Sequence, residues 1–308
     1  MNKSIKILLG VFAVLIALYF LFFRSGEKVS TDKIDAKLFV ADSSKIDKIE
    51  IVRNDGTIIF EKANNLWRVT KPVDYPADTV SVNAMLKDLK NFKLESIASE
   101  NPERFNNYLD SANNAKISTY QEGKLLGTFI LGKTQSADNT YIKKPEENRI
   151  ILASSLLASN YTKPVKDYRD QVIASINSFT VNKIEFKSTD SNKVDFTVMR
   201  DSVNMWKIGG DSVSTSVMDG FMNMFTKFAA EDFKDSVMTS FPVPAYSLNF
   251  SGPAFQLAVN FYKENVEPPS YICQVSGVNQ LFKFGSAMAS QFMKKKSDFI
   301  PVTPPKTK

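Results

Sequence analysis

The sequence predicts an α+β protein with an N-terminal transmembrane helix followed by two tandem, duplicated antiparallel sheet-plus-helix units. The first residues contain a long apolar run without charge. The segments after it alternate apolar and polar residues with the period of two that is typical of strands. The order of these segments occurs twice, since IDKIEI at residues 46–51 returns as VNKIEF at residues 181–186. We therefore expect unit 1 over residues 41–172 and unit 2 over residues 173–299.

The apolar run covers residues 7–23. As a helix it would span roughly 25 Å, and the charged side chains of Lys6 and Arg24 could extend to the membrane surface at its two ends. Bulky residues end the run, so it lacks the small residues of a cleavage site, and no cysteine follows it to carry a lipid. We expect an uncleaved signal anchor within residues 1–24 and a polar stalk over residues 25–40. A buried core helix is the alternative, which the extreme N-terminal position disfavours.

The charges around the run predict its orientation. Two lysines precede it with no acid near them, whereas Arg24 and Lys28 after it are offset by Glu27. The positive-inside rule then favours a cytoplasmic N-terminus. The bulk of the chain is expected on the periplasmic side of the cytoplasmic (inner) membrane. Residues 300–308, rich in proline and lysine, are expected to form a flexible tail.

Each unit begins with three short predicted strands joined by tight turns. The Asp-Gly pair at residues 55–56 is a hairpin signal, because glycine accepts the positive φ of such turns. The two tryptophans, Trp67 and Trp206, both fall in the third strand of their unit, and we expect them to be equivalent. Each should be largely buried against the helix that follows it. By the same comparison we expect Tyr141 to be equivalent to Tyr271.

A helix with an apolar face follows the third strand in each unit. Apolar residues recur there at helical spacing, which indicates a face packed on the sheet rather than a ligand site. The two sets are Val82, Met85, Leu86, Leu89 and Phe92, and Met218, Phe221, Met222, Phe225 and Phe228. Four further strands and a short helix complete each unit, in the order βββ-α-ββββ-α. Two unrelated α+β segments with similar patterning are the alternative to a duplication.

The residue types present exclude several chemistries. The chain has no histidine and one cysteine, which removes Ser-His and Cys-His nucleophiles, histidine metal sites and cysteine-rich metal centres. It also lacks the glycine-rich nucleotide motifs. We therefore expect no enzyme activity, no catalytic residues, no metal and no cofactor. Cys273 lies in a predicted strand, where a small buried hydrophobic residue is expected.

Two weaker candidates for chemistry remain. Residues 30–33 spell the SxxK spacing of a serine–lysine pair, but the motifs that accompany such a pair are absent, which indicates a chance match. Asp167 and Asp170 could form a carboxylate pair. Because Lys166 and Arg169 lie among them, a surface ion-pair cluster is the favoured interpretation.

The net charge says little about partners. It is +6 for the whole chain, and part of it belongs to the N-terminal anchor. This is too mild for a nucleic-acid surface, so no nucleic-acid partner is expected. The lysines at residues 294–296 could touch anionic lipid, although a solvated helix end is favoured.

Four segments resemble a bacterial family classed as a domain of unknown function. They are NNLWRVTKPVDYPAD (64–78), the helix that follows, LGKTQSADNTYIKK (131–144) and KDYRD (166–170). The resemblance covers roughly residues 45–172, whereas unit 2 lacks the Pro-Ala-Asp and Gly-Lys elements. The resemblance to this family implies a membrane-anchored extracytoplasmic protein. Some members are encoded beside ABC transporters, including gliding-motility-type systems, as auxiliary subunits. It implies no catalytic residues.

These observations favour a non-enzymatic accessory or scaffold protein of the cell envelope, with protein partners that include ABC transporter subunits. The alternative is an envelope ligand-binding module that uses the cleft between the two repeats, because such clefts often bind ligands. A hydrolase would depend only on the SxxK match and scattered carboxylates, and ranks far below both.

Overall fold

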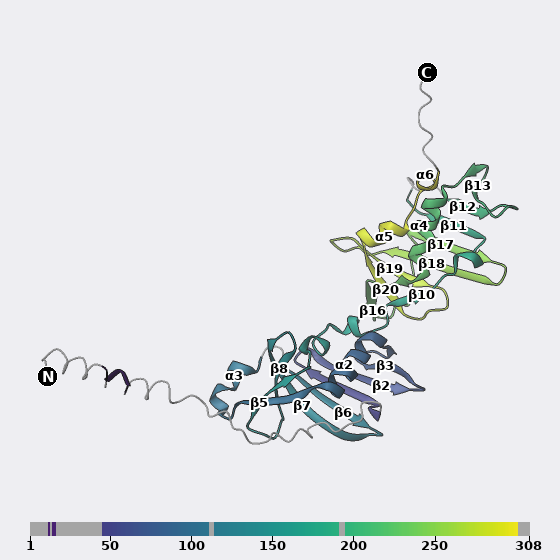
Figure 1. Ribbon diagram of the computed structural model, residues 1–308. Coiled ribbons are helices and arrows are strands. Elements are labelled where there is room, and N and C mark those ends of the chain that lie inside the picture. The colour runs from purple at the N-terminus through teal and green to yellow at the C-terminus, as the bar shows by residue number, and fades with distance from the viewer. Residues whose placement is uncertain (1–11, 13, 17–44, 111–113, 191–194, 301–308) are drawn as a thin grey trace. The chain divides into compact units, whose positions relative to one another are not determined.

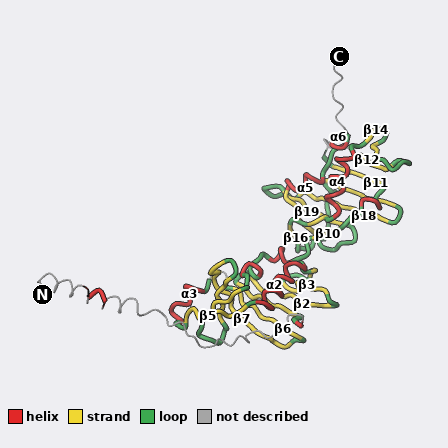
Figure 2. Tube along the Cα trace, viewed as in Figure 1, coloured by secondary structure: helices red, strands yellow, loops and turns green. Residues whose placement is uncertain are grey.

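The structure, a computed structural model, describes residues 12, 14–16, 45–110, 114–190 and 195–300. These form two compact units, and the boundary in the sequence falls between Tyr168 and Arg169 (Figure 1). Strands dominate both units (Figure 2). Among the described residues, no helix has the length and apolar character needed to cross a membrane. The expected anchor, stalk and tail lie almost entirely outside the described residues.

Unit 1 is a nine-stranded antiparallel sheet in the order β4-β3-β2-β1-β6-β7-β8-β9-β5. One longer helix, α2 (Thr79–Asn91), lies between β4 and β5 in the sequence. The strands are β1 (Lys48–Arg53), β2 (Gly56–Ala63), β3 (Leu66–Lys71), β4 (Tyr75–Pro76), β5 (Lys93–Ser99), β6 (Ala115–Gln121), β7 (Lys124–Ser136), β8 (Asn139–Lys143) and β9 (Ile150–Ser154). The short helical segments are η3 (Pro102–Arg104), α3 (Phe105–Tyr108), η4 (Ala158–Asn160) and η5 (Val165–Tyr168).

Unit 2 repeats this plan with a second nine-stranded sheet in the order β14-β13-β12-β11-β17-β18-β19-β20-β16. Its strands are β11 (Lys183–Ser188), β12 (Phe196–Arg200), β13 (Trp206–Ile208), β14 (Asp211–Ser212), β16 (Asp232–Lys234), β17 (Tyr246–Gly252), β18 (Phe255–Lys263), β19 (Ser270–Val275) and β20 (Leu281–Gly285). Its helical segments are η6 (Ser178–Thr180), α4 (Thr215–Thr226), α5 (Ser286–Phe292) and α6 (Lys296–Phe299). A two-stranded sheet pairs β10 (Val172–Ala174) with β15 (Phe228–Ala229).

The two sheets share one strand order, position by position, as a duplication requires. The ladders also confirm that the tryptophans are equivalent. Trp67 pairs with Lys62, and Trp206 pairs with Arg200. The isoleucines of the repeated Lys-Ile-Glu motif, Ile49 and Ile184, pair with Phe60 and Val198. Lys62 lies two residues after Phe60, and Arg200 lies two residues after Val198, so the two positions are equivalent.

The expected equivalence of Tyr141 and Tyr271 is wrong by one residue. Counted along the ladders from the central strands, Ile142 corresponds to Cys273, so Tyr141 corresponds to Ile272. Successive residues of a strand face opposite sides of a sheet. The two tyrosines therefore lie on opposite faces of their sheets.

The prediction of an α+β fold with antiparallel sheets is confirmed, with more strand than expected. The expected order omitted the outermost strands, β4 and β5 in unit 1 and β14 and β16 in unit 2. The expected terminal helix exists as α5 in unit 2, whereas unit 1 has only the single turn η4 at this place.

The amphipathic helices cover the inner faces of the sheets, as their spacing predicts. In unit 1, Val82, Met85 and Leu89 of α2 are buried in an otherwise largely aliphatic core. In unit 2, the same positions hold methionine and phenylalanine in α4, and all are buried. Phe228, expected on this helix, instead lies in β15, because α4 ends at Thr226.

Part of each outer face is covered by the connection that returns from the edge strand to the middle of the sheet. In unit 1 this connection contains α3, and Tyr108 packs edge-on against Tyr141, with 4.9 Å between ring centroids. The corresponding connection of unit 2 places Met238 on a small outer-face cluster of Tyr262, Ile272 and Leu281. This shared role of Tyr141 and Ile272 supports the register that makes them equivalent.

The tryptophans differ in burial. Trp206 is 9% exposed, as expected, and the Arg200 guanidinium carbon lies 4.4 Å from its ring centroid. Trp67 is only partly buried where it packs against the unit 1 core, so the expectation holds for it only in part.

Trp206→Ala should lower the free energy of unfolding by about 3–5 kcal/mol, because it empties a large buried site. Trp67→Ala should cost less, since part of that ring is already in water. Urea unfolding of the two variants, followed by circular dichroism, measures both values. Equal losses would contradict the difference in burial.

Candidate functional site

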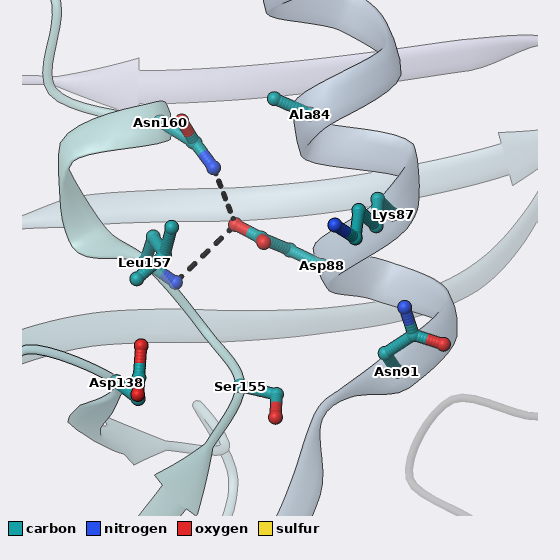
Figure 3. A pocket seen from close by; sticks show the side chains of 8 residues that line it. All are labelled: Ala84, Lys87, Asp88, Asn91, Asp138, Ser155, Leu157 and Asn160. Atoms are coloured by element: carbon teal, nitrogen blue, oxygen red, sulfur yellow. Dashed lines mark hydrogen bonds between the residues drawn. The ribbon is translucent and has the colours of Figure 1, made fainter.

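The candidate site is a hollow of about 410 Å³ in unit 1, where the C-terminal half of α2 faces the segment after β9. Figure 3 shows Asp88 reaching from α2 toward that segment, with Asn91 and Lys87 on the same helix. The lining residues are Ala84, Lys87, Asp88, Asn91, Asp138, Ser155, Leu157 and Asn160.

Local sequence places Asp88 on this helix and turns it inward. The carboxylate of Asp78 caps α2 by accepting a hydrogen bond of 2.8 Å from the backbone N–H of Ser81. Asp88 then falls next to Leu89 and one turn after Met85, on the buried face of the helix. It is consequently only 6% exposed.

Asp88 joins the helix to η4 through one carboxylate oxygen. Its Oδ2 accepts a hydrogen bond of 2.8 Å from the side-chain amide of Asn160, and one of 3.3 Å from the backbone N–H of Leu157 (Figure 3). Nearby, the Tyr161 hydroxyl donates to the Met85 carbonyl oxygen at 3.2 Å. These bonds hold the segment after β9 against α2.

The environment of Asp88 disfavours its charge. Burial raises the pKa of this carboxyl above its ordinary value, although the hydrogen bonds from Asn160 and Leu157 and the charge of Lys87 act in the opposite direction. Burial also raises the pKa of Tyr161 well above its usual range, so this neighbour stays neutral.

The walls of the hollow offer polar groups of both kinds. Asp88 and Asp138 contribute carboxylates, Lys87 an ammonium, and Ser155 a hydroxyl on a residue whose φ is +58°. No three histidine, cysteine or acidic side chains converge on a metal-sized site within the described ranges. The arrangement is suited to hydrogen bonding and charge recognition of a small polar molecule.

The second copy of the fold lacks this arrangement. In the apolar stripes of the two helices, Leu89 corresponds to Phe225, so Asp88 corresponds to Met224. In unit 2, the helix α5 packs on this side through Phe292, which contacts Phe225 at 5.4 Å between ring centroids. The buried carboxylate is thus particular to unit 1.

The structure corrects the prediction for the KDYRD segment. Arg169 is not part of a surface ion-pair cluster: it is 2% exposed and pairs with Asp235, with 2.9 Å between Nη1 and Oδ1. Asp170 accepts a hydrogen bond from the backbone N–H of Val172, which is a turn role. Asp167 contributes its backbone carbonyl to the hydroxyl of Ser81. Neither aspartate belongs to a metal-sized acidic group in the described part of the chain.

The other residues singled out from the sequence have structural roles or lie outside the described residues. Cys273 is fully buried, as expected, and burial raises the pKa of its thiol. Lys295 and Lys296 are exposed at the start of α6, and Lys296 pairs with Asp211 at 3.1 Å. The SxxK match at residues 30–33 falls outside the described residues.

The fold and the site define a class: a duplicated, sheet-rich α+β protein with a polar hollow in its first unit. Residues 67–248, more than half of the chain, match the family described as a domain of unknown function, DUF4340. The chain belongs to this family. The match begins in β3 and ends in β17, so it includes part of unit 2, which the motifs alone fitted poorly. No curated protein matches the chain, and no solved structure does.

Asp88→Asn should stabilise the protein increasingly as the pH rises. Because the folded pKa of Asp88 is raised, the folded state holds the proton more tightly than the unfolded state above the ordinary value of 3.8. Ionisation of Asp88 does not lower the free energy of unfolding below pH 3.8. The loss of stability grows as the pH rises from there to the folded pKa, and it is constant at higher pH. Besides Asp88, the charged residues that line the hollow are Lys87 on the same helix and Asp138 on the opposite side.

Thermal unfolding of wild type and Asp88→Asn across this pH interval measures the effect. Asp219→Asn, which removes an exposed carboxylate from the equivalent helix of unit 2, is the matched control and should show no such trend. A pH-independent difference for Asp88→Asn would contradict the raised pKa.

Proposed function

We propose that this chain is a non-enzymatic accessory or scaffold protein of the bacterial cell envelope, held in the cytoplasmic membrane by residues 7–23. Its partners in this proposal are subunits of an ABC-transporter-associated complex, as the family resemblance implies. Unit 2 is the part that binds the partner.

The distribution of exposed apolar side chains supports this assignment. Large exposed apolar residues gathered on one part of a protein indicate an interaction surface. Within residues 45–168 that the structure describes, the exposed set is Val52, Leu66, Val80 and Leu125. Within the described part of unit 2 it is Phe179, Met199, Val203, Met205, Val217, Val237, Phe241, Val243, Val266 and Met288.

Arg200 links two backbone segments that carry some of these side chains. Its guanidinium donates to the Ser178 carbonyl oxygen in η6 at 3.2 Å. It also donates to the carbonyl oxygen of Asn204, in the turn between β12 and β13, at 3.3 Å. Phe179, 85% exposed, therefore lies near the turn that carries Val203 and Met205, which are 73% and 50% exposed. An arginine held in place by backbone carbonyl oxygens, between segments that carry exposed apolar side chains, is a suitable anchor for a protein partner.

Replacing this group should weaken partner binding. The full-length protein, extracted in mild detergent, should co-purify with ABC transporter subunits. The triple variant Phe179→Ser, Val203→Ser and Met205→Ser should recover them at least about tenfold less well, because it removes apolar area that the partner would bury.

The matched control is the variant Leu66→Ser and Val80→Ser in unit 1, at positions that are 71% and 76% exposed. It should recover the partner as well as wild type does. Equal losses in both variants, or a wild-type protein that purifies alone, would overturn the proposal.

The anchor has a separate test. The full-length protein should stay in the membrane fraction through a carbonate wash, because residues 7–23 would be embedded in lipid. A chain that begins near Lys28 should be released. If the shortened chain still sedimented with membranes, residues 7–23 would not be the sole anchor, and the lysines at 294–296 would be the next contact to test.

Ligand binding is the second candidate function. The hollow beside Asp88 favours it, because a concave polar site with a buried carboxylate resembles a recognition site more than a structural contact. This function is independent of the partner surface of unit 2.

A further inference from the structure

Arg169 and Asp88 are the charged residues that are buried as whole residues in the described part of the protein. The side chain of Arg53 is also only 9% exposed, and it pairs with Asp55 at 2.8 Å. Burying a charge is costly unless it is paired and hydrogen-bonded. Arg169 follows this rule, because it pairs with Asp235 at 2.9 Å, donates to Gln280 at 3.1 Å, and stacks on Phe233 with 3.8 Å between the guanidinium carbon and the ring centroid.

Asp88 departs from the rule. Its donors, Asn160 and Leu157, are both neutral, and both reach Oδ2. Within the described ranges, none of the ion pairs includes Asp88. Lys87 is adjacent in the sequence and exposed, and its charge lowers the pKa of Asp88, but it is not among the ion-pair partners of this carboxylate. Among the described residues, a cation in direct ion-pair contact with Asp88 is therefore missing.

Asp88 lines a hollow that is large enough to receive a cationic molecule. The hollow of about 410 Å³ falls within the size range of small-molecule sites. A second carboxylate, Asp138, adds to its attraction for a cation. The lining also contains one ammonium, from Lys87, so the two carboxylates leave an excess of negative charge when both are ionised. Asn91, Ser155 and Asn160 offer neutral donors and acceptors that match hydroxyl groups.

We propose that the hollow of unit 1 binds a small organic amine that also carries hydroxyl groups, an amino sugar or amino alcohol, with its ammonium group at Asp88 Oδ1. The ammonium supplies the direct ion pair that no described side chain makes with Asp88. The hydroxyl groups bond to the amides and to Ser155. A divalent cation fits less well, because no three acidic, histidine or cysteine side chains converge among the described residues.

The duplicated unit supports a role beyond folding. Unit 2 closes the same side of its helix with Met224, Phe225 and Phe292, without any buried charge. The fold therefore does not need a carboxylate at this position. Unit 1 retains one at a cost in stability, as binding sites often do.

Glucosamine and glucose distinguish this site from a general sugar or polar site, because they differ only in an ammonium group in place of one hydroxyl. Both should be titrated by ligand-observed NMR into the full-length protein in detergent, in an amine-free phosphate buffer. Glucosamine should bind and glucose should bind at least about tenfold more weakly, which is the loss of one hydrogen bond to a charged group.

Asp88→Asn should weaken glucosamine binding by about ten- to a hundredfold, for the same reason. Asp219→Asn, on the exposed side of α4, should leave it unchanged. Circular dichroism and thermal unfolding should be used to check that both variants are folded. Asp88→Asn is expected to be more stable than wild type. Equal binding of the two sugars, no binding of either, or an Asp88→Asn protein that binds glucosamine like wild type would overturn the proposal.

Discussion

Each unit is organised by one topological constraint: the chain must pass from one edge of a nine-stranded sheet to the opposite edge. In unit 1, β4 and β5 are consecutive strands, yet they lie at opposite edges, and α2 stands between them. Nine strands span roughly 38 Å across a flat sheet, and the thirteen residues of α2 account for about 20 Å. The helix is thus drawn across the face that becomes the core. The return from β5 to β6 then has to use the other face, where Tyr108 meets Tyr141.

This path explains which parts of the fold could be predicted from the sequence. The alternation in β1 and β11 and the helical stripes in α2 and α4 are local patterns, and local patterns carry the period of their element. The edge strands are harder to recognise, because β16 has only three residues and the register of β5 against β9 shifts twice. The tyrosines mislead for a related reason. The chemical similarity of Tyr141 and Tyr271 says nothing about register, and one residue of shift exchanges the two faces.

The candidate site could not be predicted, because its defining property is created by a distant segment. An aspartate beside Leu89 is expected at the border of the apolar stripe, in water. Only the placement of Leu157 and Asn160, about seventy residues later, covers it. The burial of Arg169 could not be predicted for the same reason. Its ion-pair partner Asp235 and its hydrogen-bond acceptor Gln280 are remote from it in the sequence. The one available signal was internal: aligning the two copies shows a carboxylate in one helix where the other has Met224.

The near identity of the central strands has a consequence for folding fidelity. Two copies of one strand order in a single chain offer alternative partners: the backbone of β1 could pair with β17 as readily as with β6, because ladder hydrogen bonds do not read side chains. Discrimination has to come from the cores. Unit 1 fills its interior mostly with isoleucine and other aliphatic residues, whereas in unit 2 the rings of Phe221 and Phe225 of α4 and Phe228 of β15 pack against one another. A strand exchanged between the copies would leave voids in one interior and crowd the other, so the divergence of the two cores protects the chain from swapping its own repeats.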